Sequence, residues 1–401
     1  MSAALAKALE RRRARKSGIA QKTPRKSSKE EKFISSLTRT AFKRRKLTSA
    51  TDWMRKHYMI PGTSSSLSSR WNPKPYQIGM CDLMGTNERN PRRIIFPKSV
   101  RVGYTVSFTG VAIYTIVRRR KHVKIHLPTD EVIDKYSVTT AEPALQACAP
   151  AKAAMETDID GRRSANKFRK IIGGKQWVLA GTSGKTIIGD SGDVLFVDEV
   201  NNMNSTVDGI SLVKNIWRAV RVSPFRRMIL GGAPGLGSEI LREEDEKSDL
   251  RLEFAIVCPN KACKSYISLV WENFRYDGVR EYNPDRTAEN ERRAATVVYK
   301  SQCCGHEWRH EQLYESMKKG RWQTENGTHL VTGSHDPYLV NAVGKRVPMP
   351  KQITMFIWGA YFPEITWPEI ILEWLQAQLS QTDKIISVSY THLTLPTIYS
   401  V

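Results

Sequence analysis

Acidic residues are scarce in this chain of 401 residues, which has 40 Asp and Glu against 63 Lys and Arg and a formal net charge of +23. The shortage is greatest in residues 1–50, where three acids stand against 16 Lys and Arg, a net charge of +13. An excess of this kind indicates a polyanionic partner, most often nucleic acid. We expect residues 1–50 to be a disordered basic arm, either a solvated tail or an arm that binds DNA or a partner.

Long hydrophobic runs and cysteines are also few. The longest apolar run, Val106–Val117, is shorter than the ~18 residues of a membrane span and ends in three arginines. The basic N-terminus lacks the apolar stretch of a signal peptide. Six Cys are too few for a disulfide scaffold. These absences exclude a membrane partner and predict an intracellular protein.

Charge is missing from the last 17 residues, Ile385–Val401, although 26% of the chain is charged. The string Val388–Thr397 resembles a translated sequencing-library adapter. We therefore expect 385–401 to be a non-native tail, the alternative being a natural β-rich end.

Short apolar runs alternate with helical segments after Thr51. The runs expected to be strands are Arg93–Phe96, Val123–Leu127, Trp177–Ala180, Val194–Val197 and Met228–Leu230. Val106–Val117 has the length of a helix, and Thr366–Gln381 reads as another, with a capping box of Thr366 and Glu369. Such alternation predicts an α/β fold with a mostly parallel sheet and flanking helices.

A phosphate-binding loop is predicted at 98–105, between the first strand and the helix. Its residues are Lys98, Ser99, Val100, Arg101, Val102, Gly103, Tyr104 and Thr105. In such a loop the backbone N–H groups bind phosphates and the Thr hydroxyl reaches Mg²⁺. The match is imperfect, because Tyr104 stands where the motif has Lys and the first Gly is missing; a plain strand–helix turn is the alternative.

An apolar strand ending in two acids, Asp198 and Glu199, supports this reading. The strand places Asp198 at the carboxyl edge of the sheet, where it can hold Mg²⁺, and Glu199 can polarise the attacking water. An exposed acidic turn is the alternative.

A second Gly-Lys-Thr sequence, Gly181–Thr186, competes for the role of phosphate loop. Only Ile187–Asp193 separates it from the acidic strand, which leaves no room for a helix of ~10 residues. We expect a β-turn there.

Two further segments fit a nucleotide site. Tyr76 and Gln77 lie in a loop, where a ring can stack on adenine and an amide can read its edge. The loop Gly231–Ser238 follows a strand and can sense the γ-phosphate or be an ordinary flexible loop.

Four of the six cysteines form two pairs, Cys258/Cys263 and Cys303/Cys304, with His306 close behind. Thiolates and imidazole at this spacing suit tetrahedral Zn²⁺ in a small knuckle. We expect Cys258, Cys263 and Cys304 as ligands, completed by Cys303 or His306. Four buried free thiols are the alternative.

Together these segments resemble the large subunits of phage DNA-packaging terminases of the lambda type, the GpA family. The resemblance runs from about Trp53 to about Asp383, and it includes Leu127–Asp130, Ser248–Arg251 and Gly320–Trp322. It implies a P-loop ATPase core joined to a nuclease of RNase H-like fold. It also implies ATP and Mg²⁺ as cofactors, with structural Zn²⁺, and double-stranded DNA, a terminase small subunit and a portal or procapsid as partners of a homo-oligomer in the host cytoplasm.

The resemblance gives 98–105 the role of a deviant Walker A motif, and Asp198 and Glu199 those of Walker B and catalytic glutamate. Since Tyr104 replaces a Lys, another cation must neutralise the phosphates, with Arg101 the nearest choice and Lys98 the second. Ser301 stands at a position where the family usually has a zinc-ligating Cys, and Cys258-x4-Cys263 is wider than usual.

The expected organisation is a basic arm at 1–50, an ATPase domain at 51–255 and a zinc-knuckle region at 256–325. Residues 326–384 would lead towards a nuclease that is absent, followed by the tail. The expected function is an ATPase that drives double-stranded DNA into a procapsid. A helicase-like DNA-dependent ATPase and a non-enzymatic zinc-dependent DNA-binding protein are the alternatives.

Overall fold

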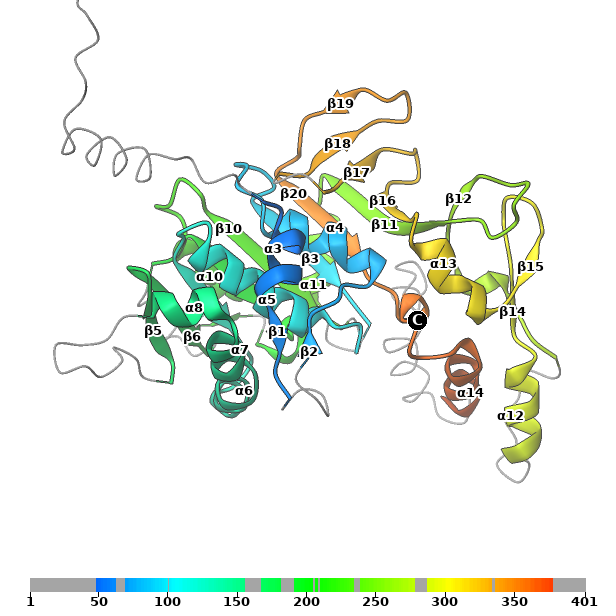
Figure 1. Cartoon of the computed structure of the whole chain (residues 1–401), viewed down its shortest axis with the longest axis horizontal. Helices are drawn as coiled ribbons and strands as arrows, with labels where there is room; N and C mark the ends of the chain where they lie inside the picture. Colours follow the sequence, from blue (N-terminus) through cyan, green and yellow to red (C-terminus); the bar gives the residue numbers. More distant parts are fainter. Residues whose placement is uncertain are drawn as a thin grey trace, which may run out of the picture. The chain divides into compact units, whose positions relative to one another are not determined.

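The computed structural model describes residues 48–62, 69–99, 101–155, 167–181, 191–204, 206–207, 210–233, 239–277, 287–333 and 336–377. The predicted arm up to residue 47, the competing loop at 182–190, residues 234–238 and the tail at 385–401 lie outside them. All of the described residues belong to one compact unit (Figure 1).

The α-helices are α3 (Ala50–His57), α4 (Pro75–Met84), α5 (Tyr104–Val117), α6 (Asp130–Tyr136), α7 (Glu142–Ala147), α8 (Ala149–Ala154), α10 (Leu212–Arg218), α11 (Glu239–Glu246), α12 (Thr287–Ala295), α13 (Leu313–Met317) and α14 (Trp367–Ala377). A π-helical turn covers Ser137–Ala141, and 3₁₀ turns cover Val200–Asn202, Trp271–Asn273, His310–Gln312 and Gly359–Tyr361.

The strands are β1 (Met59–Ile60), β2 (Ser69–Arg70), β3 (Arg93–Pro97), β4 (Val123–His126), β5 (Arg169–Ile172), β6 (Lys175–Ala180), β7 (Val194–Val197), β8 (Thr206–Val207), β9 (Ile210–Ser211), β10 (Arg227–Gly232), β11 (Leu250–Val257), β12 (Tyr266–Ser268), β13 (Phe274–Arg275), β14 (Val298–Lys300), β15 (Glu307–Trp308), β16 (Arg321–Gln323), β17 (His329–Val331), β18 (Tyr338–Val340), β19 (Arg346–Val347) and β20 (Gln352–Phe356).

The predicted parallel sheet is confirmed. Its strands run in the order β11-β20-β3-β10-β7-β4-β6, and every neighbouring pair in this series is parallel. The predicted strands correspond to β3, β4, β6, β7 and β10. In parallel sheets all carboxyl ends lie at one edge, so the segments that follow β3, β7 and β10 meet there.

The two faces of the sheet carry separate apolar clusters, because side chains alternate along each strand. Ile94 and Phe96 of β3 face the side covered by α3, α4 and α5. Ile95 faces the side covered by α10 and α11. Helix α5 is buried nearly all round, as its apolar sequence requires. It thereby fixes the loop that precedes it against the sheet.

Antiparallel strands extend the sheet beyond the predicted parallel part. Strands β16 to β19 continue it past β11, and β5 pairs with β6 at the other end. Strand β11 crosses the predicted boundary at 255/256. A separate three-stranded sheet, β13-β14-β15, follows within the predicted zinc-knuckle region.

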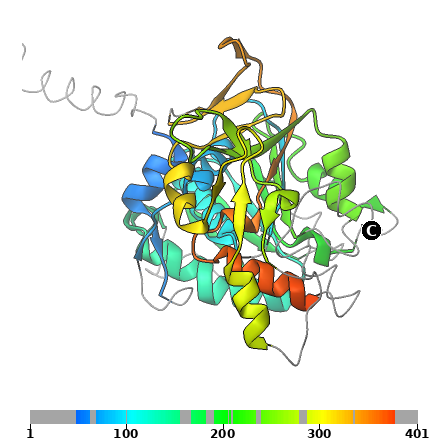
Figure 2. The same cartoon turned by 90° about the vertical axis from the view of Figure 1, so that its right-hand side faces the viewer.

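Helix α14 begins one residue after Thr366, and its predicted capping box is confirmed. The Thr366 backbone N–H donates to Glu369 Oε2 at 2.6 Å, and the Glu369 N–H donates to Thr366 Oγ1 at 3.4 Å. The helix lies beside α12 in both views (Figures 1 and 2). Among the described residues, no helix is long and apolar enough to cross a membrane.

Candidate functional site at the carboxyl edge of the sheet

Lys98 lies directly after β3 and is 4% exposed. Its backbone N–H donates to the Gly232 carbonyl at 3.1 Å, which fixes it beside the end of β10. The ammonium lies 3.5 Å from Asp198 Oδ1 and 3.6 Å from Glu199 Oε1. A buried cation is costly unless it is paired. The two predicted acids supply that pairing.

Thr105 and Asp198 meet across the carboxyl edge. The Thr105 hydroxyl, in the first turn of α5, donates to Asp198 Oδ2 at 2.8 Å. The other carboxylate oxygen accepts the Glu199 N–H at 2.9 Å. Strand β10 lies between β3 and β7, so the loop and the acids reach each other over its end. The structure therefore brings together Lys98, Thr105, Asp198 and Glu199.

Glu199 has a left-handed backbone conformation, with φ 57°. Its side chain is 39% exposed, and Oε2 accepts a hydrogen bond from Asn202 Nδ2 at 3.0 Å. Arg101 in the loop is also left-handed, with φ 61°. Non-glycine residues in this region carry strain that concentrates at functional sites. Two of the three such residues described here belong to this site.

Helix α4 holds the loop through one carbonyl. Val102 O accepts hydrogen bonds from the Tyr76 hydroxyl at 2.8 Å and from Gln77 Nε2 at 3.2 Å. Gln77 Oε1 is engaged as well, because it accepts the Lys74 N–H at 2.9 Å. Gly103 has φ 72°, and a Cβ there would lie 2.6 Å from Gln77 Nε2. Only glycine fits this turn.

Tyr76 and Gln77 belong to a helix instead of the expected loop. Tyr76 is 1% exposed and packs edge-on against Phe254, 6.2 Å between ring centroids. A ring that stacks on adenine needs an exposed face, which Tyr76 does not offer here. The Tyr76 carbonyl accepts the Trp322 indole N–H at 2.8 Å, and a Cβ on Gly79 would lie 2.4 Å from that indole. Both residues position the loop.

Tyr104 points into the core, and burial raises its pKa well above the usual value, with Asp198 raising it further. Its ring packs 5.3 Å from Phe96, and the Lys98 ammonium lies 5.2 Å from its centroid. A Cβ on Gly231 would approach the ring to 2.4 Å. Gly231 and Gly232 thus form the end of β10, where the sequence suggested a loop.

Of the two cations considered for neutralising the phosphates, Lys98 contacts the acids and Arg101 does not. Arg101 is exposed and forms no ion pair with any described residue. The pKa of Glu373 in α14 is raised by burial and lowered by the Arg101 charge, so Arg101 lies near that helix. Lys98 is the cation beside the carboxylates.

Ser99 and Val102 are buried parts of the loop. The Ser99 hydroxyl accepts the Gly359 N–H at 2.9 Å, and its own N–H donates to the Ile357 carbonyl at 2.9 Å. Val100 lies outside the described residues. His126, at the end of β4, is also buried, and burial lowers its pKa to about 3, so it contributes no charge.

The site fits a nucleotide and a divalent cation in its chemistry. A threonine hydroxyl and a carboxylate are oxygen ligands of the kind that Mg²⁺ prefers. The N-terminus of the 14-residue helix α5 attracts anions. A lysine beside the same carboxylates can neutralise phosphate charge, and Glu199 is exposed enough to contact water.

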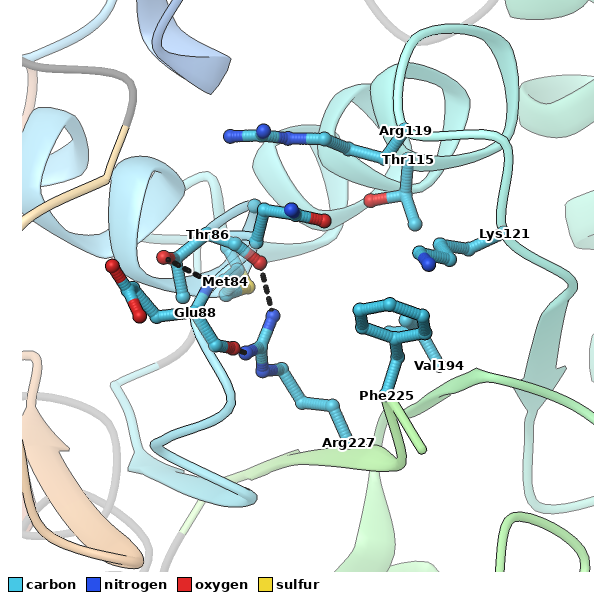
Figure 3. Close-up of a pocket in the computed structure, with 11 residues that line it drawn as sticks. Met84, Thr86, Glu88, Thr115, Arg119, Lys121, Val194, Phe225 and Arg227 are labelled. Carbon is cyan, nitrogen blue, oxygen red and sulfur yellow. Dashed lines mark hydrogen bonds between the residues drawn. The ribbon is translucent and has the colours of Figure 1, made fainter. Parts of the chain in front are cut away.

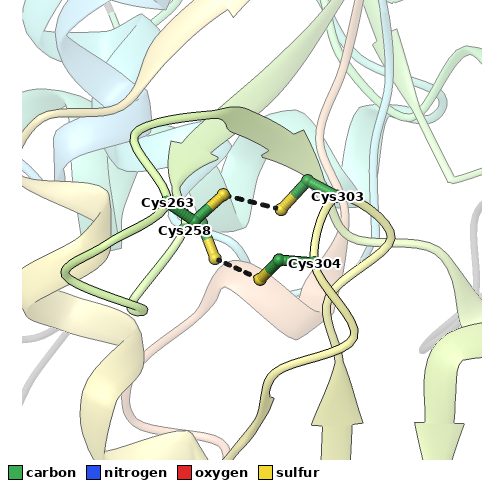
Figure 4. A group of neighbouring side chains, drawn as sticks. All are labelled: Cys258, Cys263, Cys303 and Cys304. Carbon is green, nitrogen blue, oxygen red and sulfur yellow. Dashed lines mark hydrogen bonds between the residues drawn. The ribbon is translucent and has the colours of Figure 1, made fainter.

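The four cysteines of the predicted zinc site lie together (Figure 4). All four sulfurs lie within 4.8 Å of one another. Cys258 Sγ is 3.7 Å from Cys304 Sγ, and Cys263 Sγ is 3.4 Å from Cys303 Sγ. Tetrahedral zinc with Zn–S bonds of about 2.3 Å needs sulfurs about 3.8 Å apart. The cluster fits this ion.

The cluster contains Cys303 and not His306, although both followed from the sequence as possible fourth ligands. Adjacent cysteines take part together because the turn after β14 directs both towards the turn after β11. Ser301 has a different role: its hydroxyl accepts the Trp308 indole N–H at 3.0 Å and lies 3.5 Å from Cys258 Sγ.

One residue of the nucleotide site was missed from sequence. Asn202 orients Glu199 from the 3₁₀ turn after β7. Asn202 belongs to no recognised motif. Its position three residues after Glu199 is the one feature of the sequence that could have drawn attention to it.

The chain is similar to proteins of one known family. Residues 65–322 match the family described as phage terminase large subunit gpA, ATPase domain. The large subunit of the terminase of Enterobacteria phage P21 is 27% identical over 81% of this chain and 49% of that protein. That of Escherichia phage lambda is 24% identical over 82% of this chain and 50% of that protein.

Two solved structures are similar over part of their length. The HK97 bacteriophage large terminase shares 11% identity, with a TM-score of 0.40 over 49% of this chain and 40% of that one. The ATPase domain of the Thermus phage P74-26 large terminase shares 14% identity, with a TM-score of 0.31 over 45% of this chain and 71% of that one. The chain spans about half the length of the curated relatives it matches. Since the family match covers more than half of the chain, the chain belongs to the gpA family of phage terminase large subunits, and residues 65–322 are its ATPase domain.

Proposed function

We propose that this chain supplies the ATP-hydrolysing part of a motor that drives double-stranded DNA into a viral procapsid. The contact between Thr105 and Asp198, with Lys98 against the same carboxylate, carries the proposal. Family membership supports the terminase small subunit, a portal or procapsid and further copies of the chain as partners in the host cytoplasm.

Each residue has one role in the proposed hydrolysis. Lys98 neutralises charge on the phosphates, and Thr105 and Asp198 hold Mg²⁺. When bound, this ion neutralises charge that develops on the β- and γ-phosphates. Glu199, oriented by Asn202, accepts a hydrogen bond from the attacking water and takes its proton. Tyr76 and Gln77 hold the loop through the Val102 carbonyl.

The proposal is tested by ATP turnover of the 401-residue chain with and without duplex DNA. Glu199→Gln keeps the side-chain shape but cannot take a proton, so turnover should fall by about 10²-fold or more. Nucleotide binding should stay nearly intact. The matched control is Glu272→Gln, at an exposed glutamate outside the site. Equal turnover in the two variants would exclude Glu199 from the role of base.

We also propose that Cys258, Cys263, Cys303 and Cys304 hold one structural Zn²⁺. The ion would join the turn after β11, which belongs to the main sheet, to the turn between β14 and β15. Its binding would stabilise the three-stranded sheet, because structural zinc contributes folding free energy directly.

Elemental analysis of the purified chain should find about one Zn²⁺ per chain. Cys258→Ser should release the metal and loosen residues 256–325, detected as faster proteolysis of that region. His306→Ala should keep the metal, since His306 is outside the cluster. Zinc-free wild-type protein would contradict the proposal, and loss of zinc from the His306 variant would contradict the ligand set.

A further inference from the structure

The amino ends of the parallel strands carry a row of cations at the edge opposite to the nucleotide site. We name this row the amino-edge surface; its residues are Arg89, Arg92, Lys121, Lys175, Arg221, Arg226 and Lys351. All are exposed or half-buried. They precede or begin β3, β4, β6, β10 and β20, which lie side by side with β7 in one sheet.

The cations are neighbours in space. The Arg92 N–H donates to the Lys351 carbonyl at 2.8 Å. Burial lowers the pKa of Arg92, and the charges of Arg226 and Arg89 lower it further. Arg226 also donates to the Arg221 carbonyl at 2.9 Å. The arginines and Lys351 therefore form one continuous group.

Lys121 continues the row towards Lys175. Burial lowers the pKa of Lys121, Asp193 raises it, and Lys175 lowers it again. The Lys121 ammonium lies 2.9 Å from the ring centroid of Phe225, which is 41% exposed (Figure 3). The adjacent pocket is lined in part by Thr115, Arg119 and Arg227.

None of the seven cations forms an ion pair with a described residue. Of the nearby acids, Glu88 is exposed beside Arg89, whereas Asp193 and Asp249 are engaged by the protein itself. Asp193 accepts hydrogen bonds from the Ser223 hydroxyl at 2.5 Å and the His122 N–H at 2.8 Å. Asp249 accepts the backbone N–H groups of Lys351 and Gln352, each at 3.1 Å. Like charges this close repel one another, and an external anion would relieve that repulsion.

The dimensions of the row suit a polyanion with regularly spaced charges. Six adjacent strands, from β20 to β6, span about 24 Å at about 4.8 Å per strand. One strand of B-DNA presents roughly seven phosphates over that distance, at about 3.4 Å each. The pocket beside Lys121 has a free volume of about 10 Å³, room for no more than a water. Phosphates would therefore contact the side chains at its rim.

We propose that the amino-edge surface holds the phosphodiester backbone of duplex DNA. The inference builds on the proposed packaging function and adds where the DNA lies. The nucleotide and the DNA would then occupy opposite ends of β3 and β10, about 17 Å apart along the six residues of β10. Binding through phosphate contacts alone does not depend on the base sequence, which suits an enzyme that moves along any DNA.

The test is the salt dependence of binding to a 30-base-pair duplex, measured by fluorescence anisotropy without nucleotide. The edge variant combines Arg92→Gln, Lys121→Gln and Arg226→Gln. The matched control removes the same charge from exposed lysines elsewhere, by Lys135→Gln, Lys214→Gln and Lys319→Gln. Both variants retain residues 1–47, so any binding by that segment is common to them.

The slope of log K against log [NaCl] should become shallower by about 0.9 for each lost phosphate contact, up to about 2.7 for the edge variant. Its affinity should fall at least about tenfold, while the control binds as wild type. Arg92→Lys with Arg226→Lys keeps the charges and should bind normally, which separates charge from packing.

Equal slopes for the edge variant and the control would overturn the proposal. It would also be overturned if the edge variant bound duplex DNA normally but no longer bound single-stranded RNA, because the surface would then bind RNA. Basal ATP turnover should be unchanged in the edge variant, because its residues lie outside the nucleotide site. Absence of turnover in the wild type would contradict the proposed ATPase and leave the binding result standing.

Discussion

The two ends of the parallel strands balance charge in different ways. At the carboxyl edge, Lys98 is buried against Asp198 and Glu199, and the Thr105 hydroxyl donates to Asp198. At the amino-edge surface, seven exposed or half-buried cations lie at one edge of the sheet, and none forms an ion pair with a described residue. The first arrangement fixes groups for chemistry within the protein. The second leaves charge available to a partner.

This difference predicts different costs when a cation is removed. Deleting one charge of a buried ion pair is destabilising, because the opposite charge stays buried without a partner. A repelled surface charge contributes little or is unfavourable. Urea unfolding of variants at the two edges measures this directly.

The largest effect is expected for Lys98→Ala. Removing it leaves the Asp198 carboxylate buried without its cation, so the free energy of unfolding should fall by about 3 kcal/mol. Nucleotide affinity should fall at least about tenfold. Arg101→Ala is the matched control in the same loop and should change stability by less than about 0.5 kcal/mol. A larger loss of nucleotide affinity in the Arg101 variant would restore Arg101 as the phosphate-binding cation.

An intermediate effect is expected for Gly231→Ala. The added Cβ would lie 2.4 Å from the Tyr104 ring, so the free energy of unfolding should fall by about 1–3 kcal/mol. Gly192→Ala is the control, because a Cβ there meets nothing closer than 3.7 Å. If both variants unfold at the same urea concentration, Tyr104 does not point at β10.

The smallest effect is expected for Arg92→Gln at the amino-edge surface. Removing one of several repelling charges should leave the free energy of unfolding within about 0.5 kcal/mol of wild type or raise it slightly at low salt. Adding salt should abolish any gain, since it screens the repulsion. A loss of more than about 1 kcal/mol would mean that Arg92 is held by the protein itself, and the contrast between the edges would fail.

The sequence was sufficient for the strands that build the site. The short apolar runs Arg93–Phe96, Val194–Val197 and Met228–Leu230 predicted β3, β7 and β10, because strands buried on both faces of a parallel sheet are apolar along their whole length. The short strands β17, β18 and β19 were not predicted. With two or three residues each, they have no periodicity to detect, and pairing with a neighbour defines them.

Side-chain directions could not be predicted. Lys98 and Arg101 lie three residues apart, and only the packed structure shows which one faces Asp198. Tyr104 stands at the position of a phosphate-binding lysine in the motif. Its ring is nevertheless buried, because it packs against Phe96 and fills the space that Gly231 leaves by having no side chain. Spacing likewise did not distinguish Cys303 from His306, since both lie in one turn.

The hold of α4 on the Val102 carbonyl means that nucleotide affinity can change without any change in a group that touches nucleotide. Tyr76 bonds the loop through its hydroxyl and Trp322 through its carbonyl, so the loop is linked to β16, more than 200 residues later in the chain. A substitution at Trp322 or Gly79 would shift Tyr76 and with it the loop. Weaker nucleotide binding in such a variant would result from movement of α4 and the loop, and not from a lost contact with phosphate. The position of α4 should therefore be determined before a distant residue is assigned a contact with phosphate.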